Sequence, residues 1–427
     1  MILAALHLSG QELPRRPLLG VMLQKLDSDS RRVMDYHDST GVLIKSIVAK
    51  STAEKAGFKI GDVLLRINDV DMKTPEQAVR YVANSDGGLA FTYELLREGK
   101  KITGTSVFEP MPFEQHVGIE MKYTSVQTVN GLQRLIISKL PGNEKRPVIV
   151  FIGGIGCYSL DSPLDDKRSE VQLLNQLTRK GYVCVRAEKP GVGDNRKCTP
   201  CNEVSFNNEI SGYISAVNEI KKYNYVDSGR VFVLGHSMGG VMAPVIAQKS
   251  NLKGIIAYGT IGSGFLEYLS KTRRTIAEAE QMDPAVSETF VKEACECSAY
   301  YFADGMTIKQ AVEKNPVCAE YLSVFELRSQ DYNRQLYALN IAGAWKSFTG
   351  KALIMWGEGD YISAADDHRI IVDAINQYHP GKASLVKIKN ASHSMQQAAD
   401  FKDAVTDDGS YNPEVGKKII QWLKSAT

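Results

Sequence analysis

Long hydrophobic runs are missing from this sequence of 427 residues. No run of about 18 apolar residues occurs, so the sequence predicts no transmembrane helix. A large charge imbalance is missing too: 51 basic and 49 acidic side chains give a formal net charge of +2, which offers no electrostatic reason to expect a nucleic-acid partner. With hydrophobic residues at 43%, an ordinary globular protein is the expectation.

Cysteine is scarce, and the seven residues form no obvious metal or redox motif. An odd number leaves at least one thiol without an intrachain partner, so a dense disulfide framework is not expected. Cys198 and Cys201 have C-x-x-C spacing, but a zinc ribbon needs a second such pair, and Cys295 and Cys297 are too close together. The spacing predicts a local Cys198–Cys201 disulfide or two free thiols, and no metal site.

Glycine-rich phosphate-binding motifs are absent as well. Gly154 and Gly156 lack the third glycine of a dinucleotide fingerprint, because residue 159 is serine, and no G-x-x-x-x-G-K-[ST] motif occurs. The sequence therefore predicts no nucleotide cofactor, and no other cofactor is expected.

The length predicts more than one domain, because a domain averages roughly 150 residues. The stretch Glu109–Phe113 contains two prolines and is typical of a linker. We expect a first domain over residues 14–109, a linker over residues 110–116 and a second domain over residues 117–427.

The first residues, Met1–Ser9, are apolar but short and lack a basic n-region. They are either the remnant of a trimmed export signal or a flexible arm, and no intact signal peptide is visible.

Short apolar alternations broken by glycine make the first domain β-rich, with one helical stretch from Pro75 to Asn84. Thr74 is a suitable N-cap ahead of the proline. Ala78, Val79 and Val82 are expected to form the apolar stripe of this helix.

The run from Gly41 to Asn68 resembles the core signature of a PDZ domain, of the bacterial type attached to envelope proteases. The upstream segment Arg16–Val21 corresponds to the carboxylate-binding loop of that family. The resemblance implies capture of a C-terminal peptide and favours a periplasmic or secreted setting. The groove residues that it implies are Leu18, Leu19, Gly20 and Val21. The alternative is a module that only packs against the rest of the chain or forms a dimer contact.

The second domain alternates strand-like and helix-like runs, which predicts an α/β fold with a doubly wound, mostly parallel sheet. Its expected strands are Val117–Ser125, Leu132–Leu140, Pro147–Ile152, Tyr182–Arg186, one from Val231, Leu252–Tyr258, Ala352–Trp356 and Ser384–Ile388, with helices at Ser169–Lys180 and Glu203–Tyr223.

The alternation stops over residues 262–349, where a charged segment has helical patterns and no strand candidate. We expect a helical cap over the active site, which shapes the substrate pocket. An extra helical layer packed elsewhere is the alternative.

The apolar run Val231–Gly240 ends in the pattern G-x-S-x-G. It resembles the nucleophile elbow of an α/β-hydrolase, a strained strand-to-helix turn that presents Ser237 as the nucleophile. Gly235 and Gly239 are expected where the strand and helix backbones approach too closely for a Cβ.

A serine nucleophile needs a base and an acid that orients it. His393 follows the last expected strand, where the resemblance implies the catalytic histidine, and Asp360 follows strand Ala352–Trp356 in a glycine-loosened turn. Glu358, Asp366 and Asp367 are alternatives for the acid. The other histidines are set aside: His236 as structural, His368 and His379 as surface residues, and His7, His37 and His116 as lying outside the hydrolase core.

The loop Gly153–Gly156, here called the glycine loop, resembles the oxyanion loop of that family. The resemblance implies that the amide of Met238 and one amide of the glycine loop hold the oxyanion, with Ile155 preferred over Gly154.

Together these motifs predict a serine hydrolase that forms an acyl-enzyme, acting on a small-molecule carboxylic ester. A serine peptidase of the aminopeptidase or prolyl-oligopeptidase-like kind is the alternative. A third possibility is a peptide-binding adaptor whose hydrolase fold is inert.

Overall fold

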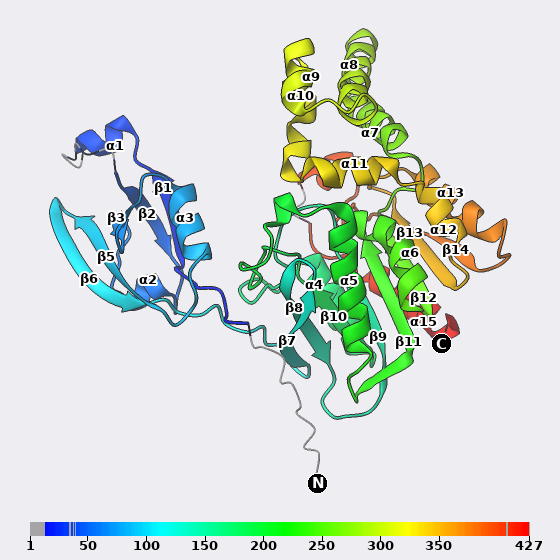
Figure 1. The fold of residues 1–427 in the computed structure, drawn as a ribbon, viewed down its shortest axis with the longest axis horizontal. Coiled ribbons are helices and arrows are strands. Elements are labelled where there is room, and N and C mark those ends of the chain that lie inside the picture. Colours follow the sequence, from blue (N-terminus) through cyan, green and yellow to red (C-terminus); the bar gives the residue numbers. More distant parts are fainter. Residues whose placement is uncertain (1–12, 34–35, 37, 39, 407–408, 427) are drawn as a thin grey trace. The chain divides into compact units, whose positions relative to one another are not determined.

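The computed structural model describes residues 13–33, 36, 38, 40–406 and 409–426 (Figure 1). Met1–Ser9 and His37 lie outside the described residues. The chain divides into two compact units, Leu13–Phe113 and a second that begins at Glu114. The division falls within the linker expected at residues 110–116.

The first unit is built on a six-stranded antiparallel sheet in the order β1-β2-β3-β5-β6, with β4 paired to β3. Among the strands that the structure describes, β1 pairs only with β2 and forms one edge. The strands are β1 (Val21–Lys25), β2 (Val42–Ile47), β3 (Val63–Ile67), β4 (Val70–Asp71), β5 (Ala90–Arg97) and β6 (Lys100–Val107), and the helices are α1 (Ser28–Val33), α2 (Thr52–Lys55) and α3 (Pro75–Ala83).

Helix α3 begins as the sequence predicts, because the Thr74 side chain accepts a hydrogen bond from the amide of Gln77. Its buried residues are Ala78 and Val82, which are four positions apart and share one face. Val79 was expected on that face, but it is 62% exposed, since it lies one residue further around the helix. That part of the helix prediction is wrong.

The second unit contains an eight-stranded sheet in the order β14-β13-β12-β11-β9-β10-β8-β7. The pairs β7–β8 and β8–β10 are antiparallel and the remaining pairs are parallel. The strands are β7 (Glu120–Thr128), β8 (Gly131–Lys139), β9 (Arg146–Ile152), β10 (Val183–Ala187), β11 (Val226–His236), β12 (Gly254–Tyr258), β13 (Lys351–Gly357) and β14 (Ala383–Ile388). Every strand expected from the sequence is found, with its ends shifted by a few residues.

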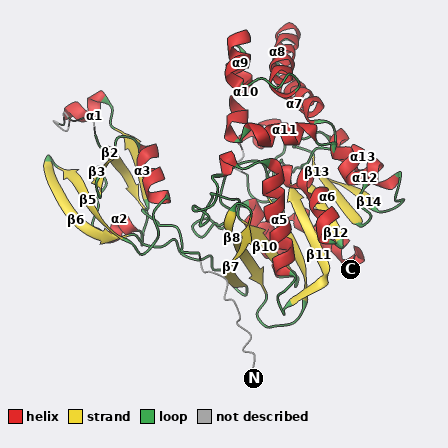
Figure 2. Cartoon of the chain, viewed as in Figure 1, coloured by secondary structure: helices red, strands yellow, loops and turns green. Residues whose placement is uncertain are grey.

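Helices cover both faces of this sheet (Figure 2). One face is packed by α4 (Ser169–Thr178) and α15 (Pro413–Ala426), whose leucines and isoleucines share a core with the strands. The other face is packed by α5 (Phe206–Ile220), α6 (Met238–Ser250) and α13 (Ala365–Asn376). The fold is therefore the doubly wound α/β architecture predicted by the sequence.

Helices fill the chain between β12 and β13, as the sequence predicts for residues 262–349. Figure 1 shows α7 to α11 gathered at one end of the sheet. The helices are α7 (Phe265–Ala279), α8 (Pro284–Phe302), α9 (Ile308–Lys314), α10 (Cys318–Leu322), the 3-10 turn η2 (Ser323–Leu327), α11 (Gln330–Ala338) and α12 (Ile341–Lys346). We call this segment the insertion.

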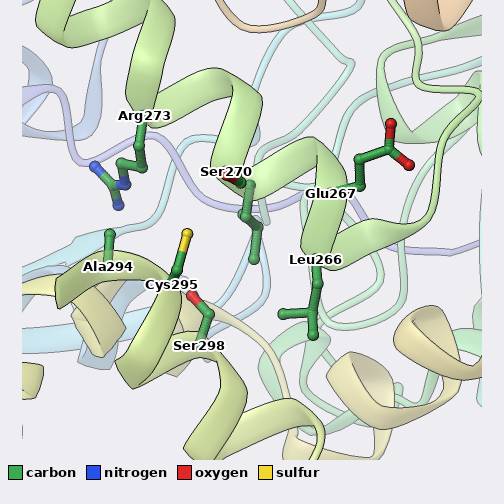
Figure 3. Close-up of a pocket in the computed structure, with 8 residues that line it drawn as sticks. Leu266, Glu267, Ser270, Arg273, Ala294, Cys295 and Ser298 are labelled. Atoms are coloured by element: carbon green, nitrogen blue, oxygen red, sulfur yellow. The ribbon is translucent and has the colours of Figure 1, made fainter. Parts of the chain in front are cut away.

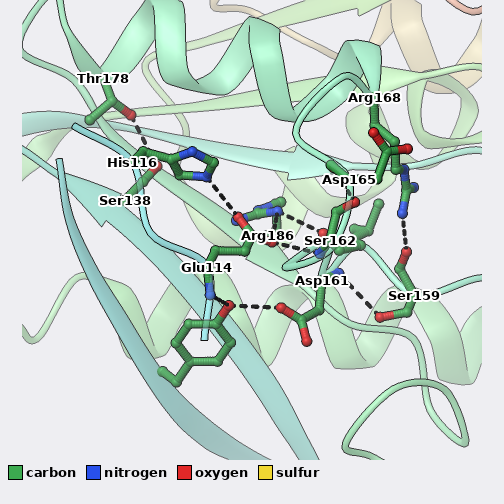
Figure 4. Close-up of polar contacts among 12 residues, drawn as sticks. Glu114, His116, Ser138, Ser159, Asp161, Ser162, Asp165, Arg168, Thr178 and Arg186 are labelled. Atoms are coloured by element: carbon green, nitrogen blue, oxygen red, sulfur yellow. Dashed lines mark hydrogen bonds and ion pairs between the residues drawn. The ribbon is translucent and has the colours of Figure 1, made fainter. Parts of the chain in front are cut away.

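A buried ion pair anchors the beginning of the second unit (Figure 4). The carboxylate of Glu114 accepts hydrogen bonds from Arg186 at 2.8 and 2.7 Å and from the amide of Ser162 at 2.7 Å. His116 contacts the same carboxylate at 3.1 Å and its side chain is 8% exposed, so its placement outside the hydrolase core is corrected. Burial opposes ionisation of Glu114, but the charge and hydrogen bonds of Arg186 outweigh it and lower the pKa of this carboxyl to about 2.

The disulfides differ from the sequence prediction. Cys201, in the turn η1 (Cys201–Glu203), pairs with Cys157, which is 44 positions earlier, and Cys198 is a buried free thiol. Both sequence alternatives, a Cys198–Cys201 disulfide and two free thiols, are therefore wrong, because the fold brings the segment after β9 against η1. A second disulfide, Cys297–Cys318, joins α8 to α10.

Within the described residues, no helix combines the length and hydropathy that a bilayer span requires.

Candidate active site

Ser237 lies in the tight turn between β11 and α6. Its backbone has φ +55° and ψ −120°, an unusual conformation for a residue with a side chain. A Cβ on Gly235 would lie 2.4 Å from the carbonyl carbon of Gly239, and a Cβ on Gly239 would lie 2.1 Å from the Ile152 oxygen. Both glycines are therefore required by close backbone contacts, and the turn holds Ser237 at the carboxyl end of a central strand.

His393 and Asp360 come together from the loops after β14 and β13. The Nδ1 atom of His393 lies 3.0 Å from both carboxylate oxygens of Asp360. The carboxylate also accepts hydrogen bonds from the amides of Ile362 and Ser363 and from the Ser363 hydroxyl. With Nδ1 donating to the carboxylate, the free Nε2 of the imidazole is an acceptor.

The environment of Asp360 keeps it ionised. Burial raises the pKa of this carboxyl, but the imidazole of His393 and the hydrogen bonds from Ser363 outweigh that effect and lower it below the ordinary value. An ionised carboxylate is what the orientation of a histidine base requires.

The glycine loop lies against Ser237. A Cβ built on Gly154 would be 3.4 Å from the Ser237 Cβ and 3.7 Å from its Oγ. The Gly154 amide donates to the Tyr158 hydroxyl at 3.3 Å. Met238 is the first residue of α6 and is 7% exposed, so its amide lies at a helix N-terminus beside the serine.

Comparisons with known families agree with this fold. A family model described as alpha/beta hydrolase matches residues 149–404, more than half of the chain. The chain belongs to the alpha/beta hydrolase family. A PDZ domain model matches residues 43–97, so the first unit of this hydrolase is a PDZ domain.

The relatives match only parts of this hydrolase. Esterase EstD of Thermotoga maritima is 29% identical over 130 residues, which is 30% of this chain and 30% of that esterase. The periplasmic serine endoprotease DegP of Salmonella typhimurium is 32% identical over 89 residues, which is 21% of this chain and 19% of the protease. Among solved structures, an esterase from Pyrobaculum calidifontis aligns with a TM-score of 0.46 at 16% identity, over 73% of this chain and 84% of that one.

The other carboxylates considered for the acid have different partners in the hydrolase. Glu358 pairs with Lys387 at 3.0 Å, and Asp366 pairs with Arg369 at 2.9 Å. Asp367 is buried and accepts hydrogen bonds from the amides of Gly262 and Ser263 and from the Ser263 hydroxyl, at the entrance to the insertion.

His368 is buried, so its expected surface position is wrong. Its Nδ1 donates to the Ala364 carbonyl at 2.8 Å and its Nε2 accepts from the Thr260 amide at 3.1 Å. Burial lowers the pKa of this imidazole. The sequence signal that could have predicted this burial is the helical spacing of Asp367, Ile371 and Ile375, which places the start of α13 against the core.

The sequence interpretation missed the contact by which His236 holds the loop that carries His393. Its Nε2 donates to the backbone carbonyl of His393 at 2.8 Å, and the two ring centroids are 5.0 Å apart. Burial, together with the nearby charge of His393, lowers the pKa of His236 to about 4. The ring is therefore neutral near pH 7 and adds no competing positive charge beside His393.

A cavity of about 220 Å³ lies between α7 and α8 of the insertion (Figure 3). Leu266, Leu269 and Ala294 contribute to its mainly apolar lining, together with the free thiol residue Cys295. A lining of this kind can bury a small apolar group.

In the segment Arg16–Val21, which corresponds to the carboxylate-binding loop of PDZ domains, one backbone amide already donates a hydrogen bond within the chain. The Leu18 amide donates to the Glu109 carbonyl at 2.7 Å, and both Leu18 and Leu19 are 8% exposed. Gly20 has φ +72°, and a Cβ there would lie 2.1 Å from the Ser51 Cβ. The Leu18 amide is thus already used within the chain, so it is not available to bind a peptide carboxylate.

Proposed function

We propose that this protein is a serine hydrolase that works through an acyl-enzyme, with Ser237, His393 and Asp360 as its triad. Ser237 Oγ bonds to the substrate carbonyl carbon while His393 Nε2 takes its proton. The bond to the leaving group then breaks, and His393 gives the proton to the departing oxygen. Water repeats the attack and releases the acid and the free serine.

The contact that carries this proposal is the one between His393 Nδ1 and the buried carboxylate of Asp360. It fixes the tautomer that a histidine base needs. The strained turn at Ser237 and the glycine loop beside it supply the nucleophile and oxyanion donors, with Met238 and Ile155 as the proposed amides.

A carboxylic ester is the proposed substrate class. The partial relative named as an esterase supports it, and no feature of the triad demands an amide. A peptidase is the second candidate, favoured by the PDZ domain, since domains of this kind bind peptide ends.

Labelling with a fluorophosphonate probe tests the nucleophile. We expect the wild-type protein to be labelled and Ser237→Ala to be unlabelled, because the probe phosphonylates an activated serine hydroxyl. Ser263→Ala is a matched control, since Ser263 donates to Asp367 outside the proposed triad. An unlabelled wild type would favour the inert adaptor, and a labelled Ser237→Ala would contradict the assignment. Turnover of short-chain p-nitrophenyl esters against aminoacyl anilides then separates esterase from peptidase.

We also propose that the PDZ domain binds a peptide C-terminus along the edge strand β1. A left-handed glycine at position 20 supports this, because it turns successive amides of the loop toward one side.

Gly20→Ala tests peptide capture. An added Cβ would meet the Ser51 Cβ at 2.1 Å, and the left-handed φ adds strain of about 1–3 kcal/mol, so the loop should shift and peptide affinity should fall at least several-fold. Fluorescence anisotropy with the full chain carrying Ser237→Ala measures it, using a C-terminal peptide library and amidated versions of the binders. Gly99→Ala is the control, since Gly99 has φ +75° with nothing within 4 Å of its Cβ position. No binder, or equal binding of amidated peptides, would contradict the proposal.

A further inference from the structure

Buried cations hold the carbonyl groups of the glycine loop. Lys189, two residues after β10, donates through Nζ to the carbonyl of Gly154 and to that of Gly156 at 2.8 Å. Arg328, which follows η2 in the insertion, donates through Nη1 to the Ile155 carbonyl at 2.8 Å. Three consecutive carbonyls of one loop are therefore held by two side chains.

Glu209 of α5 joins the two cations. Its carboxylate forms a hydrogen bond with Arg328 Nη2 and lies 3.6 Å from Lys189 Nζ. The three side chains are between 0 and 4% exposed. Two cations and one carboxylate leave a net charge of +1 buried beside the loop, where carbonyl dipoles supply the remaining compensation. We call Lys189, Glu209 and Arg328 the loop clamp.

The geometry of the peptide group turns these contacts into an orientation of N–H donors. In a planar trans peptide the carbonyl oxygen and the following N–H point in opposite directions. Lys189 holds the Gly154 carbonyl, so it directs the Ile155 N–H away from the clamp. The Gly154 amide is turned to the Tyr158 hydroxyl.

We propose that Lys189 is a positioning residue of the oxyanion hole, acting through the Gly154–Ile155 peptide group and held in place by Glu209 and Arg328. This inference rests on the proposed function, because Ile155 matters only if an oxyanion forms at Ser237. A positive charge on the carbonyl side also polarises the peptide group and strengthens its N–H as a donor. The clamp connects the insertion to the reaction centre through Arg328.

If Lys189 positions the oxyanion hole, the activity should depend on the protonation state of its ammonium group. Burial, and to a smaller extent the positive charge of Arg328, lower the pKa of its ammonium to about 8, although the carboxylate of Glu209 partly offsets both. The other titratable groups near the clamp are Tyr158, Tyr213 and Tyr332, whose pKa values are raised by burial. Because the protonated form holds the loop, Lys189 should contribute an alkaline limb to the pH profile, with activity declining as the pH rises through this pKa.

Lys189→Met is the central test, with ester turnover and binding of a small alkyl boronic acid as readouts. We expect kcat to fall about 10- to 100-fold with KM unchanged, less than the loss of an oxyanion donor itself. Affinity for the boronic acid, which imitates the tetrahedral state, should fall by the same factor. The pH profile of the wild type should decline near pH 8, and Lys189→Arg should recover activity and move that decline to higher pH, because a guanidinium stays charged.

Lys139→Met is the matched control. Lys139 is also a buried lysine, 2% exposed, that donates to two carbonyls, those of Leu140 and Gly142, and pairs with Glu120. It lies before β9, whereas the glycine loop follows that strand. Its removal should lower the melting temperature and leave kcat and the pH profile unchanged.

The possible results separate the clamp from the proposed function. Unchanged kcat in Lys189→Met would overturn the proposed role of the clamp, and so would an equal loss of kcat in Lys139→Met. In either case, turnover that still depends on Ser237 would leave the proposed triad standing. If Lys189→Met does not fold, an identical alkaline decline in the wild type and Lys189→Arg would overturn it. Full turnover by Ser237→Ala would overturn both proposals.

Discussion

We expect Asp360→Asn to lower kcat on the order of 10⁴-fold, with KM little changed. One carboxylate oxygen of Asp360 accepts from the amides of Ile362 and Ser363 at 2.9 Å each, so the amide oxygen of asparagine should take that place. Its NH₂ group would then face His393 Nδ1, which would have to accept instead of donate. The proton would move to Nε2, and the base could no longer take the proton of Ser237.

Steady-state ester kinetics and the rate of fluorophosphonate labelling should report this loss in parallel. Asp366→Asn is the control, because that carboxylate is 58% exposed and pairs with Arg369, away from His393. A kcat for Asp360→Asn within tenfold of the wild type would show that the orientation of His393 does not depend on this carboxylate.

Arg186→Met is expected to cause the largest loss of folding stability, about 3–5 kcal/mol, because it leaves the carboxylate of Glu114 buried without its cation. The Glu114 side chain is 0% and that of Arg186 4% exposed, so water cannot replace the lost partner. Thermal or urea unfolding of the full chain measures the change. A double variant, Glu114→Leu with Arg186→Met, should recover much of the loss, since it removes both charges.

Arg369→Met is the control. It removes an arginine from an exposed pair, with side chains 65% and 58% exposed, and should lower the free energy of unfolding by less than about 1 kcal/mol.

The stabilisation by the Glu114–Arg186 pair also depends on pH. Because the pKa of Glu114 falls to about 2 in the folded protein, its contribution is present above its unfolded value and is lost as the pH falls toward 2. Equal losses in Arg186→Met and Arg369→Met, or acid unfolding curves of the same shape with and without Glu114, would contradict this account.

The fold was predictable because its signals are local. Apolar strands alternate with helical patterns from β7 to β14, and G-x-S-x-G marks the one turn in which Gly235 and Gly239 must lack a Cβ. The sequence also predicted Asp360 and His393 from their positions after β13 and β14, and the structure brings these two side chains within hydrogen-bond distance. Their catalytic roles stay a prediction until the variants are measured.

The features that the sequence did not predict depend on contacts between distant segments. Cys157 and Cys201 are 44 positions apart, so no local spacing identifies the pair. Lys189 and Arg328 carry no motif, and their importance is visible only once the fold brings both against one loop. A charged side chain that belongs to no motif is normally expected at the surface, and this expectation fails where the charge has a buried partner.

The Cys157–Cys201 disulfide has a practical consequence for preparing the enzyme. Cys157 directly follows the glycine loop, so a reducing agent in an assay buffer would remove a covalent restraint next to the segment on which oxyanion binding is proposed to depend. Cys198 is a free thiol three residues from Cys201, so a reduced chain offers Cys157 a wrong partner during refolding. Oxidative expression, without reductant during purification, is therefore the appropriate route to material with reproducible specific activity.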